Sequence, residues 1–380
     1  MQWDTSQQEA IKRAMLGEDV IITGGAGTGK TTLIGEIAKQ LNGQVHIYAP
    51  TGKAAARLKE ATGYFACTVH RGLGWDGEEF RNGDRFIHPV IIDEASMMDS
   101  WLLSKVIEKN PIQLILVGDA AQLPPVSRGQ PFHDLVHLKP EKVCYLQVCH
   151  RNQSSVHKAA NLIRDGKIPP KQEKAGGESW AMLETGNGKL TEDKIIQWVQ
   201  AGAIDPFRDI VVAARYGADE TDDGNIISLN RKMLDILNPH SDGRQWEIND
   251  RVLCCKNFAK KDLWNGDIGT VTSVDVDGNI WVNLDRSREG SQQVLCESEE
   301  KKQLKLAYCL SVHKAQGSQF RRVIVVCLKK NWQMMDRSLI YTAVTRAQEG
   351  CVVCGELKAF YGGIQKMPER TTVLQQLLKS

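Results

Sequence analysis

The residues with the clearest chemical potential lie near the start of the chain, in a glycine-rich stretch that ends in a lysine and two threonines. Residues 20–32 read V-I-I-T-G-G-A-G-T-G-K-T-T and fit the pattern G-x-x-x-x-G-K-[ST] from Gly24 to Thr31. Glycines let backbone N–H groups turn toward phosphate oxygens without a Cβ clash. Lys30 is therefore expected to reach the β- and γ-phosphates of a nucleoside triphosphate, and the Thr31 hydroxyl to bind Mg²⁺. The predicted nucleotide-binding residues of this stretch are Gly25, Ala26, Gly27, Thr28, Gly29, Lys30, Thr31 and Thr32.

Two adjacent acids and one amide follow later apolar segments. Asp93 and Glu94 come directly after the run Val-Ile-Ile at 90–92, and Gln122 follows the run at 114–117. Asp93 is placed to hold Mg²⁺, and Glu94 to orient and deprotonate an attacking water. Adjacent acids at the end of a buried strand need a cation or strong donors, so a purely structural role is disfavoured. The Gln122 amide is placed to sense the γ-phosphate.

These residues need a scaffold that brings separate loops together. Apolar segments near 20–23, 45–49, 90–93, 114–117 and 143–147 alternate with helical patterns, which predicts a parallel sheet covered on both faces. Because ligands bind at the carboxyl edge of such a sheet, the loops after its strands are expected to form one site. The loop at 50–53 and the polar stretch at 68–71 lie at equivalent points of the pattern.

Residues 74–88 interrupt this alternation. Asn82-Gly83 is a strong hairpin signal, flanked by Phe80 and Phe86, and predicts a small projecting β-hairpin. A plain surface connection is the alternative. In the second half, 210–214 and 323–326 read as core strands, and 339–347 reads as a helix that presents Arg346. By contrast, 245–303 contains short strands with Gly/Asp turns and predicts a small all-β insert.

The composition is that of an ordinary soluble globular protein. The chain has 380 residues, enough for two or three domains, with 42% hydrophobic and 25% charged residues. Its net charge of +2 neither supports nor excludes nucleic acid as a partner. We expect no membrane association, since no apolar run approaches spanning length and the first residues have no signal-peptide layout. Ten cysteines without a disulfide framework favour a reducing, cytoplasmic setting in a bacterial or phage-infected cell.

The motifs, taken in order, resemble those of superfamily one DNA helicases, and most closely the RecD and Dda group, which moves 5′→3′. The resemblance rests on G-G-A-G-T-G-K-T-T, I-I-D-E-A-S-M-M-D and L-V-G-D-A-A-Q-L-P-P-V in the first half. It continues through C-H-R at 149–151, L-S-V-H-K-A-Q-G-S at 310–318 and Y-T-A-V-T-R-A at 341–347. It covers nearly the whole chain, and the ordered set is far more specific than any one motif.

The resemblance implies an α/β fold with two RecA-like P-loop motor domains built on parallel sheets. The first domain is expected over 1–147, with a β-hairpin (pin) insert at 74–88. The second is expected over 148–244 and 304–380, with a small β-barrel insert at 245–303.

The resemblance also assigns roles to residues that their own patterns leave open. From its surroundings alone Gln7 reads as a solvated helix start, but it matches the family's adenine-reading glutamine. Gly317 joins the nucleotide-binding set. Arg151 and Arg346 match residues that stabilise charge on the transferring phosphate, although either could be an ordinary surface arginine. The predicted catalytic residues are thus Lys30, Glu94, Gln122, Arg151 and Arg346.

The implied activity is that of an ATP- and Mg²⁺-dependent DNA helicase that couples ATP hydrolysis to closure between the two motor domains. It would translocate 5′→3′ on single-stranded DNA, unwind forked duplex DNA, work as a monomer, and meet recombination, repair or replication proteins. The alternatives are an ATPase accessory subunit of a recombination or nuclease complex, or an RNA-directed helicase. The predicted DNA-binding residues, as phosphate contacts or base-stacking rings, are Pro50, Thr51, Lys53, His70, Trp75, Phe80, Phe86, His313 and Lys314.

Overall fold

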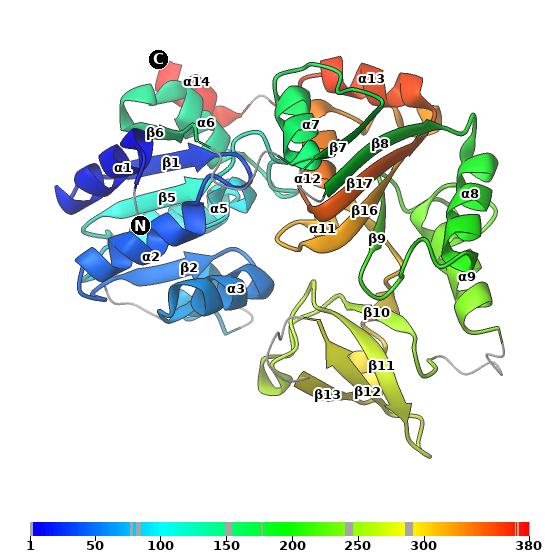
Figure 1. Cartoon of the computed structure of the whole chain (residues 1–380). Coiled ribbons are helices and arrows are strands. Elements are labelled where there is room, and N and C mark those ends of the chain that lie inside the picture. Colours follow the sequence, from blue (N-terminus) through cyan, green and yellow to red (C-terminus); the bar gives the residue numbers. More distant parts are fainter. Residues whose placement is uncertain are drawn as a thin grey trace. The chain divides into compact units, whose positions relative to one another are not determined.

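The chain folds into two compact units, each of which is described separately below (Figure 1). The computed structural model describes residues 3–76, 79–80, 85–148, 154–175, 178–239, 246–285, 292–368, 370 and 372–379. The first unit comprises Met1–Gln153 and Glu369–Ser380, and the second comprises Ser154–Pro368. The C-terminal residues, expected in the second domain, thus group with the first unit, because helix α14 (Val373–Lys379) packs on α6 (Pro131–Leu138).

The first unit is built on a six-stranded sheet in the order β3-β2-β4-β5-β1-β6, and every strand pair is parallel. Its strands are β1 (Val20–Gly24), β2 (His46–Ala49), β3 (Ala66–Thr68), β4 (Val90–Ile92), β5 (Leu114–Gly118) and β6 (Val143–Leu146). Its further helices are α1 (Thr5–Met15), α2 (Lys30–Gln40), α3 (Gly52–Thr62), α4 (Val69–Gly72), η1 (Ala95–Met97), α5 (Ser100–Glu108) and η2 (Pro140–Lys142). The five expected strands are confirmed. Strand β3 was not expected, because its sequence Ala-Cys-Thr lacks the large apolar residues of the equally short β4.

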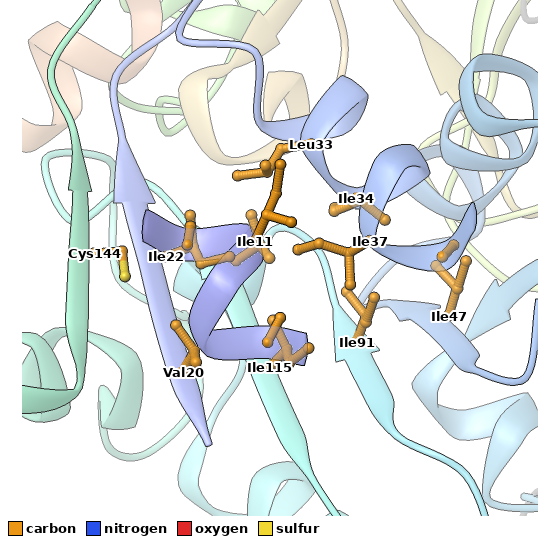
Figure 2. Packing of buried hydrophobic residues seen from close by; sticks show 14 of the residues in the cluster. Ile11, Val20, Ile22, Leu33, Ile34, Ile37, Ile47, Ile91, Ile115 and Cys144 are labelled. Carbon is orange, nitrogen blue, oxygen red and sulfur yellow. The ribbon is translucent and has the colours of Figure 1, made fainter. Parts of the chain in front are cut away.

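Both faces of this sheet are buried, which explains why its strands are continuous apolar runs. Ile22 and Ile91 lie in the cluster that α1 and α2 cover, and Figure 2 shows Ile22 beside Ile11 of α1 and Ile91 beside Ile37 of α2. The neighbouring residues Ile21 and Ile92 lie in the cluster on the other side, against α5 and α6. Alternate residues of each strand therefore anchor opposite helical layers, and the strand ends are held firmly in place.

The structure describes only part of the segment predicted as a hairpin, so the hairpin stays a prediction. Phe80 pairs with Trp75 in an antiparallel bridge, and the N–H of Asp76 donates to the carbonyl of Glu79 at 3.2 Å. The Asn82-Gly83 turn lies outside the described residues. Phe86 is buried in the core, with its ring 5.1 Å from that of His46. It therefore packs this segment onto its own sheet and is not accessible to a base.

The second unit contains a mixed sheet in the order β15-β9-β16-β17-β8-β7, in which only the β7–β8 pair is antiparallel. Its strands are β7 (Gln172–Ala175), β8 (Glu178–Glu184), β9 (Ile210–Ala213), β15 (Cys309–Ser311), β16 (Phe320–Cys327) and β17 (Ala347–Gly355). Its helices are α7 (Ser155–Arg164), α8 (Gly188–Gln200), α9 (Ile226–Leu237), α11 (Val312–Ala315), η4 (Lys329–Asn331), α12 (Arg337–Val344) and α13 (Leu357–Gln365).

A separate antiparallel sheet occupies the region of the predicted barrel. Its order is β13-β12-β11-β10-β14, and the two end strands are not paired with each other, so the described residues form an open sheet rather than a closed barrel. The elements are β10 (Arg251–Cys254), η3 (Ala259–Lys261), β11 (Ile268–Val274), β12 (Ile280–Leu284), β13 (Gln292–Cys296), α10 (Ser298–Lys301) and β14 (Leu304–Leu306). A small core that includes Val271, Ile280 and Val282 supports it.

None of the helices in the described ranges combines the length and apolar character needed to cross a bilayer.

Candidate active site

The glycine-rich loop connects β1 to α2 and depends on glycine at several points. Gly27 and Gly29 both have φ of 80°, a left-handed conformation that side chains disfavour. A Cβ on Gly24 would lie 2.6 Å from Thr28 Oγ1 and 2.8 Å from Leu146 Cβ. Gly29 precedes α2 without a side-chain cap, so the first-turn N–H groups of this helix stay available to an anion.

Lys30 stabilises the glycine-rich loop through hydrogen bonds to its backbone. Its Nζ donates to the carbonyl oxygens of Gly24 at 2.6 Å and Gly25 at 2.9 Å. The Thr28 hydroxyl donates to the same Gly25 carbonyl at 2.9 Å. An ammonium group has three donors, so these two bonds leave capacity for a phosphate oxygen.

Gln7 is not a solvated helix residue, because only 2% of its surface is exposed. Its Oε1 accepts from the Asp4 N–H at 3.1 Å as part of the capping box of α1, and its Nε2 donates to the Thr28 carbonyl at 3.2 Å. Gln7 thus ties α1 to the glycine loop. An adenine-reading role remains a prediction.

The acid pair at the end of β4 has two features typical of reactive groups. Burial raises the pKa of Asp93 to about 7, and the neighbouring Glu94 carboxylate adds to the rise. Glu94 has φ of 51°, a strained value for a residue with a side chain. Its Oε2 is buried and has no hydrogen-bond partner among the described residues, and the same holds for the nearby Ser96 Oγ. A buried polar atom without a partner is costly, which favours a role that a ligand or water completes.

Gln122 lies at the same edge of the sheet. Strand order places β4, β5 and β1 side by side, so the loops after these three strands converge at their carboxyl ends. The Ala120 N–H donates to the Thr23 hydroxyl of β1 at 3.2 Å, which ties the Gln122 loop to the strand that precedes the glycine loop. Gln122 Nε2 donates to Asp119 Oδ2 at 3.3 Å. The structure thus brings Lys30, Thr31, Asp93, Glu94 and Gln122 to one edge of one sheet.

Arg346, a predicted catalytic residue of the second unit, makes its hydrogen bonds within that unit. Helix α12 ends at Val344, not at 347 as expected, and Arg346 follows it. Arg346 is 4% exposed, and its guanidinium donates to the carbonyls of Thr342 at 3.0 Å and Ser318 at 3.4 Å and to the Thr345 hydroxyl at 3.1 Å. The expectation that a helix presents Arg346 is therefore wrong in this conformation, because three local acceptors satisfy its donors. Arg151 lies outside the described residues.

The other second-unit candidates surround α11. His313 and Lys314 lie in this helix and Gly317 follows it, with φ of 73°. Lys314 Nζ donates to Asn265 Oδ1 of the small antiparallel sheet region at 2.9 Å. Burial lowers the pKa of His313, against an opposing effect of Asp336.

Four aromatic rings gather on the first unit beside the predicted DNA-binding His70. Phe80 lies 4.7 Å from Trp75 and 5.3 Å from Trp101 between ring centroids, and His70 lies within 6.5 Å of all three. Trp101, in the first turn of α5, is 48% exposed and was not predicted as a binding residue. Its only signal in the sequence is a large apolar side chain at a helix start.

The remaining first-unit candidates follow β2. The Thr51 hydroxyl accepts from the Ala54 N–H at 3.2 Å and so caps α3, and Pro50 and Lys53 flank it. This arrangement places the Thr51–Lys53 turn at the carboxyl edge of the sheet.

The glycine loop, the strained acid and the buried amide at one edge of a parallel α/β sheet define a P-loop protein with a RecA-like nucleotide-binding unit. Comparisons with known proteins agree. Residues 2–180 match the AAA domain family, and residues 306–354 match the UvrD-like helicase C-terminal domain family.

The chain is similar to whole proteins as well. It is 30% identical over 386 residues to the ATP-dependent RecD2 DNA helicase of Deinococcus radiodurans, covering 95% of this chain and 50% of that protein. It is 28% identical to the RecBCD enzyme subunit RecD of Mycolicibacterium smegmatis, covering 98% of this chain and 74% of that protein. Among solved structures, a Bacteroides Pif1 helicase in complex with ADP-AlF3 and single-stranded DNA superposes with a TM-score of 0.55 at 20% identity, covering 97% of this chain and 95% of that one.

The chain therefore carries one segment similar to the AAA domain family and one similar to the UvrD-like helicase C-terminal domain family, and its fold is similar to that of a Pif1 helicase. It spans about half the length of the RecD2 protein that it matches.

Proposed function

We propose that this protein is an ATP-dependent DNA helicase that translocates 5′→3′ on single-stranded DNA and unwinds forked duplex DNA. The observation that carries the proposal is the convergence of Lys30, Glu94 and Gln122 at one sheet edge, in a chain whose relative is named an ATP-dependent DNA helicase. The first unit would bind and hydrolyse ATP, and movement between the units would convert hydrolysis into stepping.

Each residue at the sheet edge has a proposed part in hydrolysis. Lys30 would pair with the phosphates, and Gln122 would respond to the γ-phosphate. Glu94 would orient and deprotonate the attacking water, since its Oε2 is buried and lacks a partner among the described residues. Arg346 and Arg151 remain proposed as the cations that stabilise the transferring phosphate, which for Arg346 requires release from its present acceptors.

The residues at this edge fit a Mg²⁺ ion. Asp93 is a buried carboxylate whose pKa is raised, so a cation would favour its charged form, and Thr31 supplies a hydroxyl at the start of α2. No cluster of three His, Cys, Asp or Glu side chains suited to a metal occurs in the described part of the chain. Phosphate oxygens of the nucleotide would supply further ligands, and the ion would neutralise phosphate charge during transfer.

The aromatic cluster of His70, Trp75, Phe80 and Trp101 is proposed to stack on the bases of the single strand. Trp101 is exposed and the other three rings are half-buried. Aromatic rings stack on any base, and each stacked base contributes roughly 1–3 kcal/mol. The phosphate contacts would come from Thr51, Lys53 and, in the second unit, His313 and Lys314. Phe86 is withdrawn from this set because it is buried.

Two measurements test the proposal. The rate of ATP hydrolysis is compared with and without single-stranded DNA, and forked duplexes with a 5′ or a 3′ tail are then offered for unwinding. Stimulation by DNA and unwinding from the 5′ tail are expected. No stimulation would rule out a translocase, and unwinding from a 3′ tail alone would reverse the polarity.

A second candidate function is an ATPase subunit of a recombination complex, favoured by the similarity to a protein named as the RecD subunit of the RecBCD enzyme. It predicts ATP hydrolysis without unwinding by the isolated chain. Unwinding by the purified protein alone would contradict it.

A further inference from the structure

The C-terminal segment of the chain binds the loop that carries Gln122. Arg370 Nη1 donates to the Pro125 carbonyl at 2.7 Å, and Nη2 donates to the Ser127 carbonyl at 2.5 Å. Both carbonyls lie a few residues beyond Gln122 in the same loop. A planar guanidinium that bridges two carbonyls restrains their relative position.

A buried acid holds the next part of the segment. Asp134 of α6 is 1% exposed and accepts from the Thr372 hydroxyl at 2.6 Å and from Gln375 Nε2 at 2.7 Å. The preceding residue, His133, makes a 3.1 Å hydrogen bond from Nε2 to the Gln122 carbonyl. Because a carbonyl only accepts, the imidazole donates here. Adjacent residues of α6 thus hold Gln122 through one side chain and the C-terminal segment through the other.

The chain just before this segment is anchored in the second unit. The Lys366 carbonyl accepts from the Arg337 N–H at 2.9 Å, and Lys366 Nζ donates to the Gln333 carbonyl at 2.7 Å. Arg337 is the first residue of α12, the helix that precedes Arg346. Only the sequence Met367-Pro368-Glu369 separates this anchor from Arg370. Three residues between two anchors let the Cα atoms of those anchors lie at most roughly 14 Å apart, and the proline further restricts the backbone.

We propose that the C-terminal segment is a tether that joins the Gln122 loop to α12, and that Arg370 and Asp134 are positioning residues for Gln122. The inference rests on the proposed function, because it assigns Gln122 to the γ-phosphate. The segment connects the two units a second time, after the connection near residue 153. Movement of α12 would pull on the Gln122 loop through this link, so its length matters as well as its anchors.

The anchor is tested with Arg370→Ala, its conservative partner Arg370→Lys, and the exposed control Lys39→Ala of α2. Arg370→Ala should lower kcat of DNA-stimulated ATP hydrolysis by about tenfold, because a small displacement of a positioned group is costly. Affinity for a fluorescent ATP analogue and the melting temperature should stay close to those of the unmodified protein. Arg370→Lys should recover part of the loss, and Lys39→Ala should change nothing. The positioning role would be overturned if Arg370→Ala left kcat unchanged, or if it weakened nucleotide affinity by the same factor as it lowered kcat.

The length of the tether is tested by inserting about six Gly/Ser residues after Pro368, which adds slack while keeping both anchors. The control is the same insertion after Gly202. This glycine lies in an exposed turn, and a Cβ added to it would meet no atom within 4 Å. We expect the Pro368 insertion to preserve ATP binding but to reduce base pairs unwound per ATP severalfold, and the Gly202 insertion to leave this ratio unchanged. An unchanged ratio after the Pro368 insertion would overturn the tether.

The outcomes separate this inference from the proposed function. If the unmodified protein hydrolyses ATP but unwinds nothing, the helicase proposal fails, while the kcat loss in Arg370→Ala still measures the anchor. If the unmodified protein unwinds DNA and both variants match it, the helicase proposal stands and the tether fails.

Discussion

Two buried acidic sites, one in each unit, show how burial alone fails to distinguish chemistry from structure. Asp209 of the second unit accepts from Arg321 Nε at 2.8 Å and Nη2 at 2.9 Å and from Arg322 Nε at 3.1 Å. Burial alone would raise the pKa of Asp209, but these arginines outweigh it and lower the pKa. In the first unit, burial raises the pKa of Asp93, and Glu94 combines a strained backbone with an oxygen that lacks a partner among the described residues.

The difference lies in the pairing of the charge. The Asp209 carboxylate has its acceptors filled by its own unit, so it stabilises the fold and leaves nothing to bind a ligand. In the acid pair of the first unit, Glu94 Oε2 has no partner among the described residues, and we propose that a cation or water completes this pair during catalysis. The following predictions challenge this distinction, beginning with the largest effect.

Replacing Glu94 with glutamine should abolish most hydrolysis, because the amide cannot accept the proton of the attacking water. We expect kcat for ATP to fall by about 10²–10⁴-fold while ATP still binds. Steady-state ATPase assays with an equilibrium binding measurement check this. Turnover near that of the unmodified protein would remove Glu94 as the base.

Replacing Asp209 with asparagine should lower the stability of the fold and leave ATP binding unchanged. Two arginines would lose their partner, and the free energy of unfolding should fall by about 2 kcal/mol, since both are partly exposed. Chemical denaturation measures the loss. ATP affinity of the folded protein should not change, and a selective loss of ATP binding would contradict a structural role.

The two acids should also respond oppositely to pH. Between the ordinary value of 3.8 and about 7, folded Asp93 keeps a proton that the unfolded chain has released, so its contribution to stability falls as pH rises. The slope cannot exceed about 1.4 kcal/mol per pH unit for one proton. Asp209, whose pKa is lowered, contributes stability that is lost only as pH falls below 3.8. Denaturation in EDTA without nucleotide should show a flatter profile between pH 4 and 7 for Asp93→Asn than for the unmodified protein.

The smallest expected effect concerns the aromatic rings. Trp101→Ala should weaken binding of single-stranded DNA by about fivefold, near the lower limit for one stacked base. Phe86→Leu serves as the control, because Phe86 is buried and the change removes its ring while keeping an apolar side chain there. Fluorescence anisotropy at fixed salt measures both. Equal weakening by the two variants would mean that the rings act through the fold rather than by stacking.

Much of the first unit was predictable from local pattern. Five of its six strands, the glycine loop and the acid pair were all expected in place, since continuous apolar runs and glycine spacing are local properties. Strand β3 was not predicted, because its sequence Ala-Cys-Thr lacks large apolar residues. The end of α12 was not predicted, because helix ends carry weak periodic signals. The predicted barrel is an open sheet among the described residues, since strand composition does not specify which edges pair.

The sequence by itself determined which chemical groups this protein has and the order in which they occur, from the lysine after the glycines to the acids after β4. Only the tertiary structure decided which of them are available. The strand order placed three loops at one edge of the sheet, and packing between distant segments buried Gln7 and Phe86. The guanidinium of Arg346 is hydrogen-bonded to carbonyl oxygens of its own unit. Tertiary structure also placed Trp101 beside Phe80 and Arg370 against the loop that carries Gln122. Burial and pairing depend on contacts between residues far apart in the chain, which no local pattern encodes.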